Sequence, residues 1–109
     1  MSLFSTIDAL ALADLLKEGG CDLIDVRNDE EVARGMIAGA RHIPLAQLPA
    51  RFSELGRDRP VVFYCQSGAR SMQASAFLAA RGWPQVSNLT GGVIAWVRSG
   101  QALVFPGAG

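Results

Sequence analysis

The sequence has few cysteines, a single histidine and no excess of either charge. Its 109 residues contain two cysteines, Cys21 and Cys65, and one histidine, His42. Two cysteines far apart do not form the disulfide framework of a small secreted domain, so we expect a reduced, cytoplasmic setting. No set of cysteine, histidine and carboxylate residues has metal-ligand spacing, and we therefore expect no metal site.

The balance of charge and the short apolar runs exclude further classes of partner. Ten basic residues balance ten acidic ones and are scattered along the chain, so we expect neither nucleic acid nor a membrane as a partner. The apolar runs are far shorter than the ~20 residues that span a bilayer, and we expect no secretion signal. Half of the residues are hydrophobic, which favours one domain over residues 1–109 with its core in about 5–100.

Short apolar runs alternate with segments of helical period, a pattern typical of a parallel sheet covered by helices. The runs predict strands at 4–7, 23–26, 42–43, Val61–Tyr64 and 85–89. The intervening segments predict helices after Asp8, after Asp29, over 71–81 and after Gly91. A further helix is predicted over 45–55, interrupted or started at Pro49. The strand Val61–Tyr64 is apolar on both faces, and we therefore expect it to be central.

A cysteine follows this central strand directly and precedes a helix. Because the first N–H groups of a helix lack intrahelical partners and the dipole is positive there, such a thiol occupies a natural anion site. Those surroundings lower a cysteine pKa and favour the reactive thiolate. We therefore predict Cys65 as a nucleophile near the surface, with stabilising N–H groups from the loop and helix start: Gln66, Ser67, Gly68, Ala69, Arg70 and Ser71.

The sequence also predicts roles for residues other than Cys65. Gly68 allows the loop to turn its N–H groups inward as a nest, and Arg70 adds a permanent charge that can dock an anion. Ser67 and Ser71 are interpreted as loop filler and helix N-cap, which is compatible with lining the pocket. Asp25 and Arg27 lie at a strand end, where as an ion pair they hold the Cys65 loop or fix the rim of the site, or else contact substrate. The remaining candidates, Cys21, His42, Trp83 and Trp96, are interpreted as structural.

Three further stretches make the chain resemble a single-domain rhodanese, a family of sulfurtransferases. They are the strand-end Asp-Val-Arg at 25–27, the Gly-x-Ile-x-Gly-Ala-x-x-Ile-Pro pattern at 35–44 and the Leu-x-Gly-Gly-x-x-x-Trp pattern at 89–96. With the 65–71 loop they occur in the family's order. One departure is Met36, where the family usually has histidine.

The resemblance implies a three-layer α/β/α sandwich with a central five-stranded parallel sheet, and a reaction without a cofactor. Cys65 would take the sulfane sulfur of thiosulfate or of a persulfide donor and pass it to cyanide or a thiol. Its partners would then be a small sulfur donor and acceptor, with thiol proteins as a further possibility. The absence of a second positive charge in the loop leaves the identity of the donor open.

Other functions share parts of this pattern. Cysteine phosphatases and arsenate reductases use Cys-x5-Arg, whereas the spacing from Cys65 to Arg70 is Cys-x4-Arg, which makes a narrower cradle. A non-catalytic rhodanese module that only binds a partner commonly lacks the cysteine, which this chain retains. A carrier that relays persulfide between proteins would have the same sequence features as an enzyme.

Overall fold

The computed structural model, which describes residues 3–106, contains a sheet of five parallel strands. The strands are β1 (Ser5–Ile7), β2 (Asp22–Asp25), β3 (Arg41–His42), β4 (Val61–Tyr64) and β5 (Val86–Leu89). They lie in the order β1-β5-β4-β2-β3, so β4 is central as predicted. Residues 1–2 and 107–109, the ends of the expected domain, lie outside the described part.

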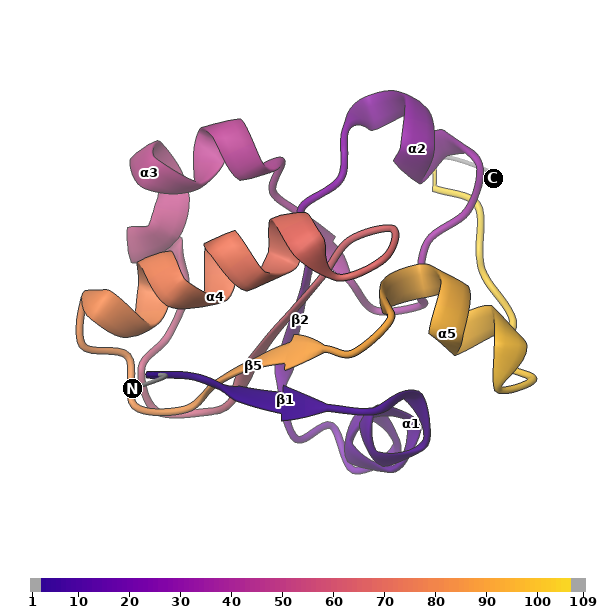
Figure 1. The fold of residues 1–109 in the computed structure, drawn as a ribbon, viewed down its shortest axis with the longest axis horizontal. Helices are drawn as coiled ribbons and strands as arrows, with labels where there is room; N and C mark the ends of the chain where they lie inside the picture. Colours follow the sequence, from indigo (N-terminus) through magenta and orange to yellow (C-terminus); the bar gives the residue numbers. More distant parts are fainter. Residues whose placement is uncertain (1–2, 107–109) are drawn as a thin grey trace.

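Helices cover both faces of the sheet, which confirms the three-layer architecture (Figure 1). The helices α3 (Leu48–Arg51) and α4 (Ala69–Ala80) lie on one face, and α1 (Ala9–Lys17) and α5 (Gly92–Arg98) lie on the other. Side chains of a strand alternate between faces. Val61, Phe63 and Cys65 accordingly join the core beneath α3 and α4, whereas Val62 and Tyr64 join the core beneath α1 and α5.

The short helix α2 (Asp29–Ala33) follows β2 at the carboxyl edge of the sheet, near the loop that precedes α4 (Figure 1). Asn28 caps it, since the Asn28 side chain accepts from the Glu31 N–H and the Glu31 carboxylate accepts from the Asn28 N–H. Its first turn is acidic, as the helix dipole favours. The predicted helix after Asp8 is likewise capped by the Asp8 carboxylate, which accepts from Ala11 N at 2.8 Å.

Two helix predictions differ in detail from the structure. The segment 45–55, expected to be a helix interrupted or started at Pro49, consists of three short pieces, the 3-10 turns η1 (Leu45–Gln47) and η2 (Phe52–Glu54) with α3 between them. Pro49 lacks an N–H and is tolerated only in the first turn of a helix, so it starts α3 and prevents a longer one. The helix expected from Ser71 begins at Ala69, because Gly68 adopts φ +113° and turns the chain directly into it.

Among residues 3–106, no helix combines the length and the apolar composition needed to cross a bilayer.

Candidate active site

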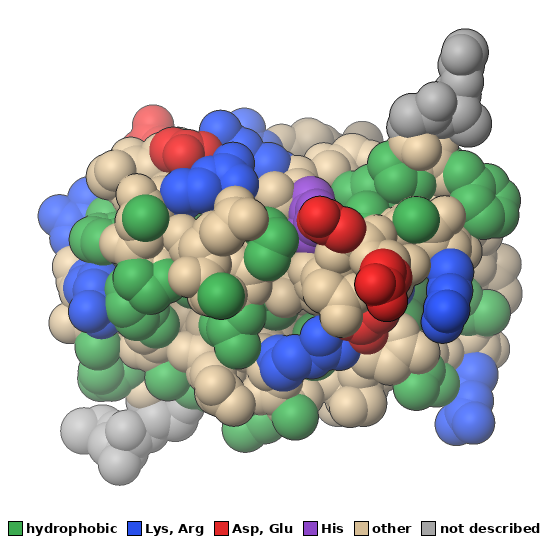
Figure 2. Space-filling view, turned by 90° about the horizontal axis from the view of Figure 1, so that it is seen from above, with side chains coloured by type: hydrophobic (Ala, Val, Ile, Leu, Met, Phe, Trp, Pro, Cys, Tyr) green, Lys and Arg blue, Asp and Glu red, His purple; other side chains and the backbone are tan. Residues whose placement is uncertain are grey.

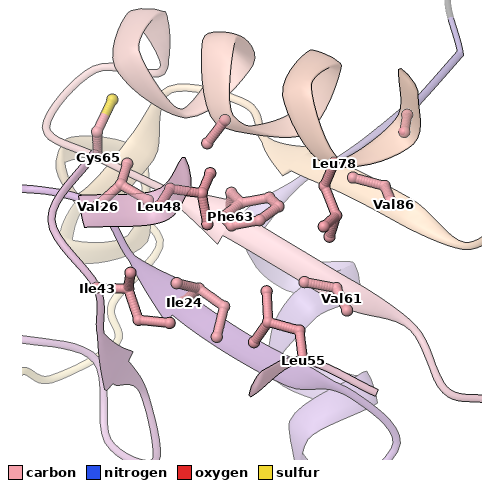
Figure 3. Close-up of a cluster of buried hydrophobic side chains, with 12 residues drawn as sticks. Ile24, Val26, Ile43, Leu48, Leu55, Val61, Phe63, Cys65, Leu78 and Val86 are labelled. Atoms are coloured by element: carbon pink, nitrogen blue, oxygen red, sulfur yellow. The ribbon is translucent and has the colours of Figure 1, made fainter. Parts of the chain in front are cut away.

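The Cys65 side chain lies at the carboxyl end of β4, at the edge of the core beneath α4. Figure 3 shows its sulfur directed away from the packed row of Phe63 and Val61, toward the start of α4. The residue is 1% exposed, so the expectation that it lies near the surface is wrong. The N-terminus of α5 packs over the backbone of Cys65 and Gln66.

Two hydrogen bonds attach α5 to this loop. Val93 N donates to Cys65 O at 2.9 Å, and Ile94 N donates to Gln66 O at 3.3 Å. Gly92 makes this approach possible, since a Cβ atom there would lie 2.5 Å from the carbonyl oxygens of both Cys65 and Gln66. Its φ of +58° also favours glycine. The Gly91-Gly92 pair at the start of α5 therefore allows the helix to hold the backbone of the cysteine.

The sulfur of Cys65 accepts hydrogen bonds from the turn that follows it. Gly68 N donates at 3.1 Å, Ser71 N at 3.4 Å, and Ser71 Oγ lies at 3.4 Å. Burial acts to raise the pKa of Cys65, but the hydrogen bonds from the Ser71 hydroxyl and from the N–H groups of Ser71, Gly68 and Ser67 outweigh it, and the pKa is lowered. The predicted nest is therefore present, formed by Ser67, Gly68 and Ser71.

The other predicted members of the nest have different positions. Gln66 is exposed and lines a neighbouring cavity, and Ala69 is exposed in the first turn of α4. Ser71 is not the N-cap, a position that Gly68 occupies. Ser71 is instead fully buried in the first turn, which brings its hydroxyl to the sulfur.

Asn88 of β5 is a member of the site that the sequence did not reveal. It is buried and its Oδ1 accepts from the Ser71 hydroxyl, while that hydroxyl also lies 3.1 Å from Gly68 O. One hydroxyl proton serves one acceptor at a time. Asn88 Oδ1, Gly68 O and the Cys65 sulfur therefore compete for the Ser71 hydroxyl proton. Asn88 is a polar amide in the strand next to the one that precedes Cys65, and this is the signal that could have identified it.

We expect the Ser71→Ala variant to have a raised Cys65 pKa, because it lacks the hydroxyl donor while the backbone donors of Ser67, Gly68 and Ser71 remain. A hydrogen bond of about 1 kcal/mol changes an equilibrium roughly fivefold, so the rate of Cys65 alkylation at pH 7 should fall by up to about that factor. The measurement is the pH dependence of alkylation by iodoacetamide, followed by mass. Ser75→Ala is the control, since the buried Ser75 hydroxyl donates to Ser71 O, away from the sulfur. An unchanged pH profile in Ser71→Ala would contradict this role.

Arg70 forms an ion pair that the sequence analysis did not anticipate. Its Nη1 and Nη2 donate to the two Glu31 carboxylate oxygens at 2.6 and 2.8 Å, and hydrogen bonding to Arg70 lowers the pKa of Glu31 to about 2. Figure 2 shows acidic side chains gathered over α2 beside the histidine, with a basic side chain against them. Both of these guanidinium nitrogens are therefore engaged by Glu31, and a role in docking an anion stays a prediction.

Asp25 and Arg27 form a buried ion pair at the carboxyl end of β2. Arg27 Nε donates to both carboxylate oxygens at 3.1 Å and Nη2 donates to Oδ2 at 2.8 Å. A second bond from Nη2, to Gly35 O at 2.8 Å, ties the pair to the turn after α2. His42 Nε2 lies 2.6 Å from Arg27 O, which is the contact of a structural histidine. The geometry thus favours a structural ion pair that holds the turn after α2 at the rim, rather than substrate contact.

Comparisons with known proteins agree on one family. The model of the rhodanese-like domain matches residues 8–99. A sulfurtransferase of Allochromatium vinosum is 50% identical over 84 residues, covering 77% of this chain and 78% of that protein. The human thiosulfate:glutathione sulfurtransferase is 34% identical over 106 residues, covering 84% of this chain and 92% of that protein. A rhodanese-related crystal structure from Thermoplasma volcanium superposes with a TM-score of 0.86 at 30% identity, covering 93% and 98% of the two chains.

Proposed function

Because this chain belongs to the rhodanese-like family, we propose that it is a sulfurtransferase that carries a sulfane sulfur as a persulfide on Cys65. The observation that carries the proposal is that the Cys65 sulfur accepts hydrogen bonds from Gly68 N, Ser71 N and Ser71 Oγ. These donors stabilise negative charge on sulfur, first on the thiolate and then on the persulfide.

In the first half-reaction the Cys65 thiolate attacks the outer sulfur of thiosulfate. A Cys65 S–S bond forms, the S–S bond of thiosulfate breaks, and sulfite leaves with that electron pair. The terminal sulfur of the enzyme persulfide carries one negative charge. No proton has to move, which agrees with a site whose sulfur is surrounded by hydrogen-bond donors and by no general base within hydrogen-bond reach among the described residues.

In the second half-reaction an acceptor takes the terminal sulfur. A thiolate or cyanide attacks it, the bond to Cys65 breaks, and the thiolate of Cys65 is regenerated with that electron pair. The human relative is named for thiosulfate and glutathione, which supports thiosulfate as a donor and a thiol as an acceptor. Splitting the transfer into two displacements at one cysteine requires no cofactor.

Intact mass spectrometry tests the proposal. The protein is incubated with thiosulfate and, separately, with an organic persulfide, and its mass is compared with that of untreated protein. We expect a gain of one sulfur atom that disappears when cyanide or dithiothreitol is added. Failure of every donor to load the protein would overturn the proposal.

The Arg70–Glu31 pair provides a prediction about anionic donors. If Arg70 attracts thiosulfate, Arg70→Ala should lower kcat/KM for thiosulfate by roughly tenfold, mainly through KM, because one charge-assisted contact is lost. Glu31→Gln should instead raise kcat/KM a few-fold, because it frees the guanidinium. Arg51→Ala and Glu54→Gln are matched controls, as they remove an exposed pair at 3.1 Å that is not part of the site. Equal losses in Arg70→Ala and Glu31→Gln would show that the pair acts only structurally.

A further inference from the structure

A cavity of about 590 Å³ opens beside the Cys65 loop. Its walls come from the end of α2, the outer face of α5 and the segment after α5, which Figure 1 shows running from α5 back toward α2. Gln66, which follows the nucleophile directly, is part of the lining. The other lining residues are Arg27, Glu31, Arg34, Gly35, Val93, Ile94, Val97, Arg98 and Leu103. This volume lies within the ~300–1,000 Å³ typical of sites for small organic molecules.

The floor of the cavity is apolar and uncovered. Ile94 and Val97 of α5 are 38% and 48% exposed, although they lie beside the reactive loop. Leu103 completes the floor, and its segment is held in place because Met36 and Val104 exchange backbone hydrogen bonds of 2.7 and 2.8 Å. Trp96 Nε1 also donates to Ala102 O at 3.1 Å. A fixed apolar surface of this kind is suited to the carbon skeleton of a ligand.

The charges around the cavity leave an excess of two positive groups. Arg27 is paired with Asp25, and Glu31 is paired with Arg70. The exposed side chains of Arg34 and Arg98, in contrast, have no carboxylate partner among residues 3–106. Two unpaired guanidinium groups on an apolar cavity are complementary to a ligand that carries carboxylates.

We propose that this cavity binds the organic body of a small thiol that carries carboxylates, so that its sulfur reaches Cys65 past Gln66. The proposal rests on the proposed function and names the class of its acceptor. The bound thiol loses its proton to solvent, and its thiolate attacks the terminal sulfur of the Cys65 persulfide. The new S–S bond forms as the bond to Cys65 breaks, which leaves a small-molecule persulfide and a Cys65 thiolate.

Binding is tested without any reaction by using S-methylglutathione, whose sulfur cannot accept a sulfur atom. We expect amide chemical shifts of Ile94, Val97 and Leu103 to move in NMR spectra of the labelled protein. The diethyl ester, which lacks both carboxylates, and the double variant Arg34→Ala/Arg98→Ala should each bind roughly 3- to 10-fold more weakly, since exposed ion pairs contribute modestly. Arg51→Ala is the control variant and should bind like the wild type. Equal binding of the acid and the ester would overturn the proposal.

Transfer provides the second readout. Protein loaded with sulfur is mixed with glutathione or with its diethyl ester, and the ratio of the two kcat/KM values is measured. We expect wild type and Arg51→Ala to prefer the acid, and the double variant to lose that preference. If the wild type can be loaded with sulfur but has equal kcat/KM values for glutathione and its diethyl ester, the cavity proposal alone is overturned. Binding of S-methylglutathione by a protein that no donor can load would overturn the proposed function and support the cavity.

Discussion

Sulfur transfer by the Cys65→Ser variant should fall to background, a loss on the order of 10³-fold or more, because removal of a nucleophile eliminates the covalent route. A serine hydroxyl cannot form a persulfide, and its proton is not lost at neutral pH. The checks are the rate of sulfite release from thiosulfate and the intact mass after loading. Since the residue is 1% exposed, circular dichroism and a thermal unfolding curve must accompany the assay to show that the variant is folded.

Cys21→Ser is the matched control for this experiment. Cys21 is also free and buried, and burial raises the pKa of its thiol, so it lacks the activation that Cys65 has. It precedes β2 whereas Cys65 follows β4, and parallel strands place these positions at opposite edges of the sheet. The variant should therefore retain nearly all of the turnover. Substantial activity in Cys65→Ser, or loss of sulfur loading in Cys21→Ser, would contradict the assignment of the nucleophile.

The parts of the fold that were predictable from sequence depend on local pattern. The run Val61–Tyr64 is apolar at every position, which only a central strand with both faces covered can satisfy, and it is the middle strand. The nest around Cys65 could also be predicted, since Gly68 turns the chain and the following helix supplies free N–H groups. Both features are encoded within a few consecutive residues.

The features that could not be predicted from the sequence depend on contacts between residues that are far apart in it. Arg70 pairs with Glu31 only because α2 and the start of α4 meet at the same edge of the sheet. The Asn88 contact to Ser71 likewise requires β5 to lie next to β4. The close approach of Gly92 to the Cys65 carbonyl oxygen also requires α5 to fold back over the loop. In each case the residue type was visible in the sequence and its partner was not.

The second large effect concerns stability. Asp25→Ala should destabilise the protein by about 3–5 kcal/mol, the range measured when one partner of a buried ion pair is removed. Asp25 is 0% exposed and Arg27 is 3% exposed. Without the carboxylate the guanidinium stays in the interior with only neutral acceptors, the carbonyl oxygens of Gly35 at 2.8 Å and Glu31 at 3.4 Å. Urea unfolding measures the change, read as a lower midpoint with an unchanged m-value.

Two further variants test whether the stability loss in Asp25→Ala comes from the unpaired buried charge of Arg27 or only from the lost contact. Arg51→Ala removes an exposed pair whose side chains are 34% and 38% exposed, and it should cost less than about 1 kcal/mol. The double variant Asp25→Ala/Arg27→Leu removes both buried charges and should be more stable than Asp25→Ala alone, because no unpaired charge remains inside. If the double variant is instead less stable than Asp25→Ala, then Arg27 contributes more through its bonds to the α2 turn than the unpaired charge costs. In that case the pair is chiefly an anchor for α2, and through Glu31 for Arg70 beside the reactive loop.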